Sequence, residues 1–316
     1  MSTIPLGIFA SSAAKTWTFS SALPDAATRG YSQGVAFGAS NQFVMLRSTD
    51  SAPSVISDNN SLISTNGANW TQGTLPAAMR AIAGNGNIVV AFPNTGGLPW
   101  YTTDGTTWTR STGTGNGESV RHAYWDGNKF IAVSENSTPT ITTSTDGIAW
   151  TGNTSLNGSG GATGITNNGT TYLAVLRDEV LARLSTNNLV SFTGVSLGTD
   201  ASWSAVAFAN GVYVVIANNN TSYRTSTNGT TWTIRTLPAA PGTNGNSGAL
   251  VRMGVVDGRF VYVASNTRLY ESSDGINWLL RSGPQVTAST ASTGFATNGN
   301  IAIASLANSD HYLIYS

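Results

Sequence analysis

The sequence contains no cysteine and only two histidines, and both shortages exclude kinds of site. Without cysteine there is no disulfide framework, no thiolate metal ligand and no thiol nucleophile. His122 and His311 are too few to build a histidine-rich metal centre. We therefore expect neither a metal nor a cofactor.

Charge is also sparse, since only 9% of the residues are charged and the formal net charge is zero. Lysine occurs only at Lys15 and Lys129. A surface that holds phosphate backbones needs a concentration of cations, so nucleic acid is not expected as a partner. No apolar run reaches the roughly 18 residues of a membrane-spanning helix, so we also expect no membrane insertion.

What the chain has in abundance is a turn motif of the form Ser-Thr-(Asp/Asn)-Gly-x-x-Trp-Thr. Near-complete copies begin at Ser64, Thr102, Ser144, Ser226 and Ser272, and a degenerate copy begins at Ser185. A fixed repeat of this size is typical of stacked or radially arranged units. The aromatic positions, which recur at intervals of 38 to 46 residues, are Trp70, Trp108, Trp150, Phe192, Trp232 and Trp278.

A second signature precedes these motifs, an Asn-Gly or Asp-Gly pair followed by an apolar, β-branched run. Asn85-Gly86, for example, precedes the run at 88–91. Such pairs are the strongest short signal for a β-hairpin, because a turn that matches strand twist needs positive φ. Each unit therefore contains two hairpins, and we predict a four-stranded antiparallel meander of roughly forty residues, the size of a propeller blade.

The repeated motif has a structural explanation in the second of these hairpins. An aspartate or asparagine in the turn can accept backbone N–H bonds, and the glycine after it supplies positive φ. The tryptophan three residues later is predicted to start the next strand and bury its ring against the neighbouring blade. We therefore assign a structural role to Asp104, Asp146, Asn228, Asp274, Trp70, Trp108, Trp150, Trp232 and Trp278.

A seventh copy of the unit is divided between the two ends of the chain. The last residues, 311–316, resemble the lead-in to a motif, and residues 15–18 resemble its end. We therefore predict an all-β fold, a single seven-bladed β-propeller of four-stranded antiparallel blades. The N- and C-terminal strands share one blade and close the ring. Residues 15–316 form this propeller, and residues 1–14 are an N-terminal arm.

The Ser, Asp, Gly and Trp positions of the motif resemble the Asp-box, or BNR, repeats of sialidase-like β-propellers. The resemblance covers nearly the whole chain, in a variant with one residue fewer between the aspartate and the glycine. It implies a propeller and a comparison with sialidases, which bind the carboxylate of their sugar with an arginine cluster. The Phe-Arg-Ile-Pro segment typical of that family is absent from this sequence.

Aligning the first turn of each unit brings three arginines into register. Arg80, Arg121 and Arg252 each lie six residues before a turn glycine, near the start of the predicted innermost strand. Guanidinium groups match carboxylates bidentately, so these residues are candidates for binding an anion or an acidic sugar. The alternative is that their stems pack between blades and their heads pair with local carboxylates.

We do not expect an enzyme. Glycosidases generally need two carboxyl groups at a set separation, and the spacing of Glu135, Asp178 and Glu179 does not require such a pair. The main hypothesis is a virion module, a bacteriophage tail or capsid appendage for assembly or host attachment. Its partners would be other virion proteins and a host-surface glycan, and it would be made in the host cytoplasm. A sialidase-like hydrolase and an extracellular bacterial lectin are the alternatives.

Overall fold

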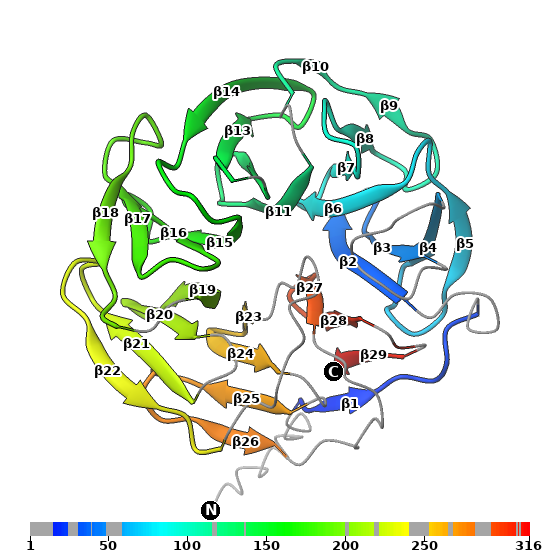
Figure 1. The fold of residues 1–316 in the computed structure, drawn as a ribbon. Helices are drawn as coiled ribbons and strands as arrows, with labels where there is room; N and C mark the ends of the chain where they lie inside the picture. The colour runs from blue at the N-terminus through cyan, green and yellow to red at the C-terminus, as the bar shows by residue number, and fades with distance from the viewer. Residues whose placement is uncertain are drawn as a thin grey trace, which may run out of the picture.

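The computed structural model describes residues 15–24, 31–38, 40–48, 59–115, 119–135, 137–199, 202–217, 221–239, 253–264, 268–281, 292–307, 309 and 311–316. These residues form seven sheets, antiparallel except for one short strand, arranged in a ring (Figure 1). The protein is thus an all-β, seven-bladed β-propeller, as the two hairpin signatures predict. The predicted N-terminal arm, residues 1–14, and Arg252 lie outside the described residues.

The first four blades follow one another along the chain, each running from its innermost to its outermost strand. Blade 1 consists of β2 (Tyr31–Gly38), β3 (Gln42–Ser48), β4 (Asn60–Ser64) and β5 (Thr71–Thr74). Blade 2 consists of β6 (Met79–Gly84), β7 (Val89–Pro93), β8 (Trp100–Thr102) and β9 (Thr109–Arg110). Blade 3 consists of β11 (Val120–Trp125), β12 (Phe130–Ser134), β13 (Thr140–Ser144) and β14 (Ala149–Ser155). Blade 4 consists of β15 (Ala162–Asn167), β16 (Tyr172–Leu176), β17 (Leu181–Ser185) and β18 (Thr193–Ser196).

The remaining three blades complete the ring. Blade 5 consists of β19 (Trp203–Ala209), β20 (Val212–Ala217), β21 (Ser222–Ser226) and β22 (Thr233–Thr236). Blade 6 consists of β23 (Met253–Val256), β24 (Arg259–Val263), β25 (Leu269–Ser272) and β26 (Leu279–Arg281). Blade 7 consists of β27 (Ser292–Thr297), β28 (Ala302–Leu306), β29 (Tyr312–Tyr315) and β1 (Trp17–Phe19).

Strands from both ends of the chain share blade 7. In Figure 1 the blue strand β1 lies beside the red strand β29. The two pair antiparallel in the register Trp17↔Tyr315, Thr18↔Ile314 and Phe19↔Leu313. The last blade therefore takes its outermost strand from the beginning of the sequence, where the motif fragment at 15–18 lies.

One strand was not anticipated from the sequence. The short strand β10 (Thr112–Gly113) follows blade 2 but pairs in parallel with β14, the outermost strand of blade 3. Blade 3 consequently has five strands, and the segment that follows blade 2 covers part of its outer edge. Covering an edge in this way satisfies backbone groups that could otherwise pair with another molecule.

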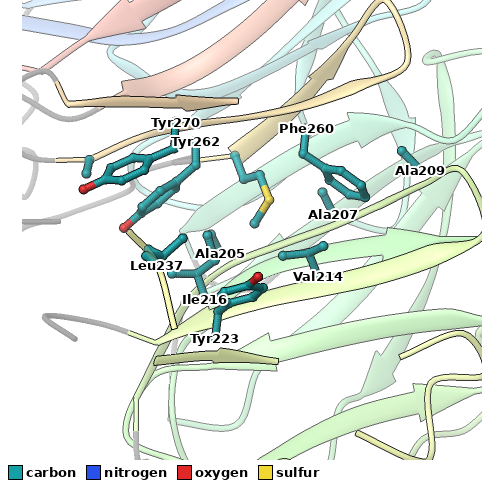
Figure 2. Close-up of a cluster of buried hydrophobic side chains, with 12 residues drawn as sticks. Ala205, Ala207, Ala209, Val214, Ile216, Tyr223, Leu237, Phe260, Tyr262 and Tyr270 are labelled. Atoms are coloured by element: carbon teal, nitrogen blue, oxygen red, sulfur yellow. The ribbon is translucent and has the colours of Figure 1, made fainter. Parts of the chain in front are cut away.

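The core of the propeller lies between the blades rather than in one central cluster. Figure 2 shows the cluster between blades 5 and 6, where Tyr223 of blade 5 and Phe260, Tyr262 and Tyr270 of blade 6 are buried. Alanines of the inner strand β19 complete this cluster, because side chains must be small where the blades converge. Within the part of the chain that the structure describes, six further clusters have similar positions around the ring.

The motif turn is held by a short hydrogen-bond network, seen clearly in blade 3. The Ser144 hydroxyl accepts from the Gly147 N–H at 2.8 Å and donates to Asp146 Oδ1 at 2.9 Å. The same Oδ1 accepts from the N–H groups of Ile148 and Ala149 at 2.8 and 2.9 Å. Gly147 has a φ of 75°, which side chains with a Cβ rarely adopt. Equivalent networks surround Asn66, Asp104, Asn228 and Asp274.

The motif tryptophans pack between their own blade and the preceding one. Trp150 is only 1% exposed and meets Phe92 of blade 2 edge-to-face, with ring centroids 5.0 Å apart. Trp70 is buried against Tyr312 of blade 7 in the same arrangement. The remaining motif tryptophans are half-buried against the corresponding clusters; they are Trp108, Trp232 and Trp278.

The turn aspartates predict how the protein responds to acid. Backbone N–H bonds from Thr107 and Thr106 hold the pKa of Asp104 well below its ordinary value, and those from Asn277 and Ile276 do the same for Asp274. A depressed carboxyl pKa stabilises the folded state above the unfolded value of about 3.9, and that stability is lost as pH falls below it.

We therefore expect the double variant Asp104→Asn, Asp274→Asn to lose less stability than the wild type as the pH falls below about 4, the ordinary pKa of an aspartate. Asparagine already forms the same turn at Asn66 and Asn228, so the variant should melt normally at pH 7. Thermal melts across this pH range test the expectation. Equal losses in both proteins would show that these carboxylates do not govern acid stability.

Candidate functional site

The candidate site is a cavity of about 390 Å³ in the central channel. The inner strands of all seven blades line it: β2, β6, β11, β15, β19, β23 and β27. Most of the lining is apolar or small. The side chains in it that can ionise are Arg80, Arg121, His122 and Tyr124, and no aspartate or glutamate is among the described lining residues.

The side chains of Arg80 and Arg121 are oriented by β-bulges. The register between β6 and β7 skips Arg80, and the register between β11 and β12 skips Arg121. A bulge leaves one residue unpaired and redirects its side chain. The same irregularity occurs at the start of β15, β19 and β27, where the skipped residues are Thr163, Ser204 and Thr293. The repeated bulge is thus a feature of the scaffold, and blades 2 and 3 place a guanidinium group on it.

Both guanidinium groups pair with one carboxylate. Arg80 and Arg121 each bind Glu135, which follows β12 in the loop toward β13. Arg80 also donates to the Ser119 hydroxyl at 2.9 Å, and Arg177 of blade 4 approaches Glu135 to 3.8 Å. The side chains of Arg80 and Arg121 are only 8% and 7% exposed. Glu135 therefore ties blades 2, 3 and 4 together at this mouth of the channel.

The arginine cluster extends to a second carboxylate. Arg177 lies 3.5 Å from Asp178, whose side chain is 73% exposed. The described part of the cluster thus joins three guanidinium groups to two carboxylates, one of them largely in water. The sequence alignment correctly brings Arg80 and Arg121 together, whereas Arg252 lies outside the described residues. Their role in binding a ligand stays a prediction, because both already hold an internal carboxylate.

Two polar side chains of β11 lie next to the arginines. His122 and Tyr124 line the cavity, with ring centroids 5.7 Å apart. Burial lowers the pKa of His122 from 6.5 to about 4, so the imidazole is neutral at pH 7. Burial also raises the pKa of the Tyr124 hydroxyl. His122 Nδ1 and Tyr124 Oη have no hydrogen-bond partner among the described residues, which is unusual for buried polar atoms.

The carboxylates considered for glycoside hydrolysis are engaged elsewhere. Glu179 binds Arg183 of its own blade and accepts from the Ser159 hydroxyl at 3.1 Å. Glu135 is bound by arginines, and neither glutamate lines the cavity. The described residues contain no group of three or more histidine, aspartate or glutamate side chains that could hold a metal. Nor does the described chain include a helix long and apolar enough to span a membrane.

Solved structures resemble this chain in fold. A catalytically inactive variant of virginiamycin B lyase from Staphylococcus aureus with Quinupristin has a TM-score of 0.74 at 11% identity, covering 96% of this chain and 99% of that one. YCF48 bound to D1 peptide has a TM-score of 0.63 at 14% identity, covering 95% and 96%. The WD40 β-propeller domain of Doa1 has a TM-score of 0.65 at 11% identity, covering 96% and 97%.

At these identities the likeness concerns the fold alone. No protein-family model matches the chain, and no curated protein matches it in sequence. The structural neighbours include a lyase and a propeller described with a bound peptide. The class of protein is therefore a seven-bladed β-propeller, and its activity has to be argued from its own channel.

Proposed function

We propose that this protein is a non-enzymatic β-propeller that serves as a structural and host-attachment module of a virus particle, on a bacteriophage tail or capsid. The carrying observation is the arginine cluster at the channel mouth, which places two guanidinium groups beside a cavity whose described lining has no carboxylate. Such a site suits binding of an anion, whereas glycoside hydrolysis needs two carboxyl groups across the bond.

Composition and fold supply the support for a particle component. The chain has no cysteine, is 9% charged and includes 35 glycines. The Asp-box-like turns make a rigid scaffold, and function on such scaffolds tends to lie at the loops. YCF48, a structural neighbour, is described with a bound peptide, which supports a protein partner of some kind here. We propose that other virion proteins are this partner. We call the end of the channel at Arg80 and Arg121 the arginine mouth, and we propose that it binds an acidic host glycan.

Location is the first test. Mass spectrometry and electron microscopy of purified particles should find the propeller as a particle component. Its recovery only as a secreted protein would favour the bacterial lectin instead. Release of sialic acid from a fluorogenic sialoside, lost in a Glu135→Gln variant, would favour the sialidase-like hydrolase and contradict a non-enzymatic role.

Binding of an acidic sugar is the second test. We expect 3′-sialyllactose to bind, and Arg80→Gln or Arg121→Gln to weaken binding about tenfold each, since one charged hydrogen bond contributes roughly 1.5 kcal/mol. Glu135→Gln should strengthen binding, because it removes the carboxylate that competes for both guanidinium groups.

Calorimetric titration measures these affinities, and Arg235→Gln on the outer strand β22 is the matched control. Thermal melts must show that each variant is folded. If folded wild type does not bind, or if Arg235→Gln weakens binding as much as Arg121→Gln does, the arginines at the mouth only tie the blades together.

A further inference from the structure

A second cavity, of about 430 Å³, lies at the opposite end of the channel. The arginines lie at the start of the inner strands, whereas this cavity extends to the turns that follow β6 and β27. It shares residues such as Ile82, Ala123 and Tyr124 with the first cavity, so the two belong to one channel. We call this end the turn mouth.

Four aromatic side chains are among the residues that line the turn mouth. Phe37 of blade 1, Tyr124 and Trp125 of blade 3, and Phe295 of blade 7 all line it, and each is half-buried. Trp125 is held by Phe130 behind it, with ring centroids 4.8 Å apart. Three blades thus present aromatic surface to one space. No lysine, arginine, aspartate or glutamate is among its described lining residues.

Two asparagines at the turn mouth offer hydrogen-bond donors. Asn85 Oδ1 accepts from the N–H groups of Asn87 and Ile88 at 3.1 and 3.0 Å. Asn298 Oδ1 accepts in the same way from Asn300 and Ile301 at 2.9 and 2.8 Å. The oxygens are thus committed to the turns, and each amide is left with its Nδ2 donors. Neither Nδ2 has a hydrogen-bond partner among the described residues.

We infer that the turn mouth binds a neutral carbohydrate, one hexose unit entering the channel. Aromatic surface suits the apolar C–H face of a pyranose, and sites for small molecules combine such surface with a few fixed polar groups. The described lining residues carry no charge, so they favour an uncharged ligand. The amide donors need acceptors, and a sugar hydroxyl can accept from them and turn its own hydrogen elsewhere.

A peptide fits these observations less well. Its backbone brings an N–H group with almost every residue, and a buried N–H needs an acceptor. The side-chain oxygens of Asn85 and Asn298 are occupied by their own turns. The inference is independent of the proposed function, because the arginine mouth and the turn mouth use different polar groups.

The chain itself supplies fold-neutral variants. Asp126 occupies the same turn position in blade 3 and accepts from Asn128 and Lys129, each at 2.8 Å. Asn85→Asp and Asn298→Asp should therefore keep the turn acceptor while removing the Nδ2 donors. Asn168→Asp makes the same change in blade 4, where the turn has equivalent bonds but does not line the cavity.

Saturation-transfer NMR with methyl β-D-galactopyranoside, methyl α-D-glucopyranoside and N-acetylglucosamine tests the inference. We expect at least one of these sugars to bind with a Kd of about 1 mM, and Asn85→Asp and Asn298→Asp to weaken it about tenfold. Asn168→Asp should have no effect, and Arg121→Gln should leave this binding intact while reducing that of 3′-sialyllactose.

Three results would overturn the inference: no saturation transfer from the protein to any of the three sugars, equal effects of Asn168→Asp and Asn85→Asp, or binding only of a phenylalanine-containing dipeptide tested in parallel. If no hexose binds but sialyllactose does, only the inference about the turn mouth is rejected. If a hexose binds but sialyllactose does not, only the proposed acidic-glycan site at the arginine mouth is rejected.

Discussion

Removing residues 1–20 should cause aggregation or abolish cooperative unfolding, because the deletion takes away β1 and exposes the edge of β29. Three residues of β1 pair with β29, and Ser20 and Tyr312 bond each other through backbone and side chain at 3.0 Å. Trp17 and Phe19 also pack against the cluster between blades 6 and 7. An exposed apolar edge strand is a site for intermolecular pairing.

A shorter deletion provides the control. Removal of residues 1–13 leaves β1 and its hydrogen bonds in place, so this variant should melt close to the wild type. Circular dichroism melts with light scattering compare the three proteins. If the longer deletion unfolds with the wild-type midpoint and scatters no more light than the wild type, the shared blade does not close the ring.

Trp150→Ala should lower the free energy of unfolding by about 3 to 5 kcal/mol, the usual range for truncating a buried large aromatic residue. The side chain is 1% exposed and contacts Phe92 and Phe130 in two different blades. Its indole N–H also donates to the Gly147 carbonyl at 3.1 Å, within the motif turn. The substitution therefore removes both packing between blades and a bond that supports the turn.

Substitutions at the equivalent positions of other repeats should have smaller effects on stability. Trp108→Ala and Trp232→Ala should cost less, because both rings are half-buried. Trp150→Phe should retain most of the stability, since blade 4 already uses Phe192 at this position in the cluster with blade 3. Urea unfolding followed by circular dichroism measures the differences. A Trp150→Ala protein with near-native stability would contradict the assignment of this ring to the core.

Most of the fold could be predicted because its signals are local. The Asp146 turn needs an acceptor, a hydroxyl and a glycine within a few residues, so a short stretch of sequence is enough to predict it. Repetition of that turn gives the number of blades, and the motif fragments at the two ends indicate the shared blade. β10 was missed because its parallel pairing with β14 joins segments far apart in sequence and follows no repeat.

The site could be predicted only in part. The register of turn glycines brought Arg80 and Arg121 into one layer, since equivalent positions of adjacent blades lie side by side. That Glu135 binds both could not be read from spacing, because the loop holding it reaches an arginine of another blade. Phe37, Trp125 and Phe295 belong to no motif, so the aromatic turn mouth had no signal in the sequence.

Short-range chemistry thus settles the blades, their number and their turns at the level of the sequence, since each needs only neighbouring residues. The tertiary structure of the ring determines the contacts between residues of different blades. It determines which charge faces which, that the arginine mouth carries its own carboxylate, and that aromatic residues from three blades share one space. Such contacts arise only after each sheet has packed on the next, because the residues that meet are separated by one or more whole repeats.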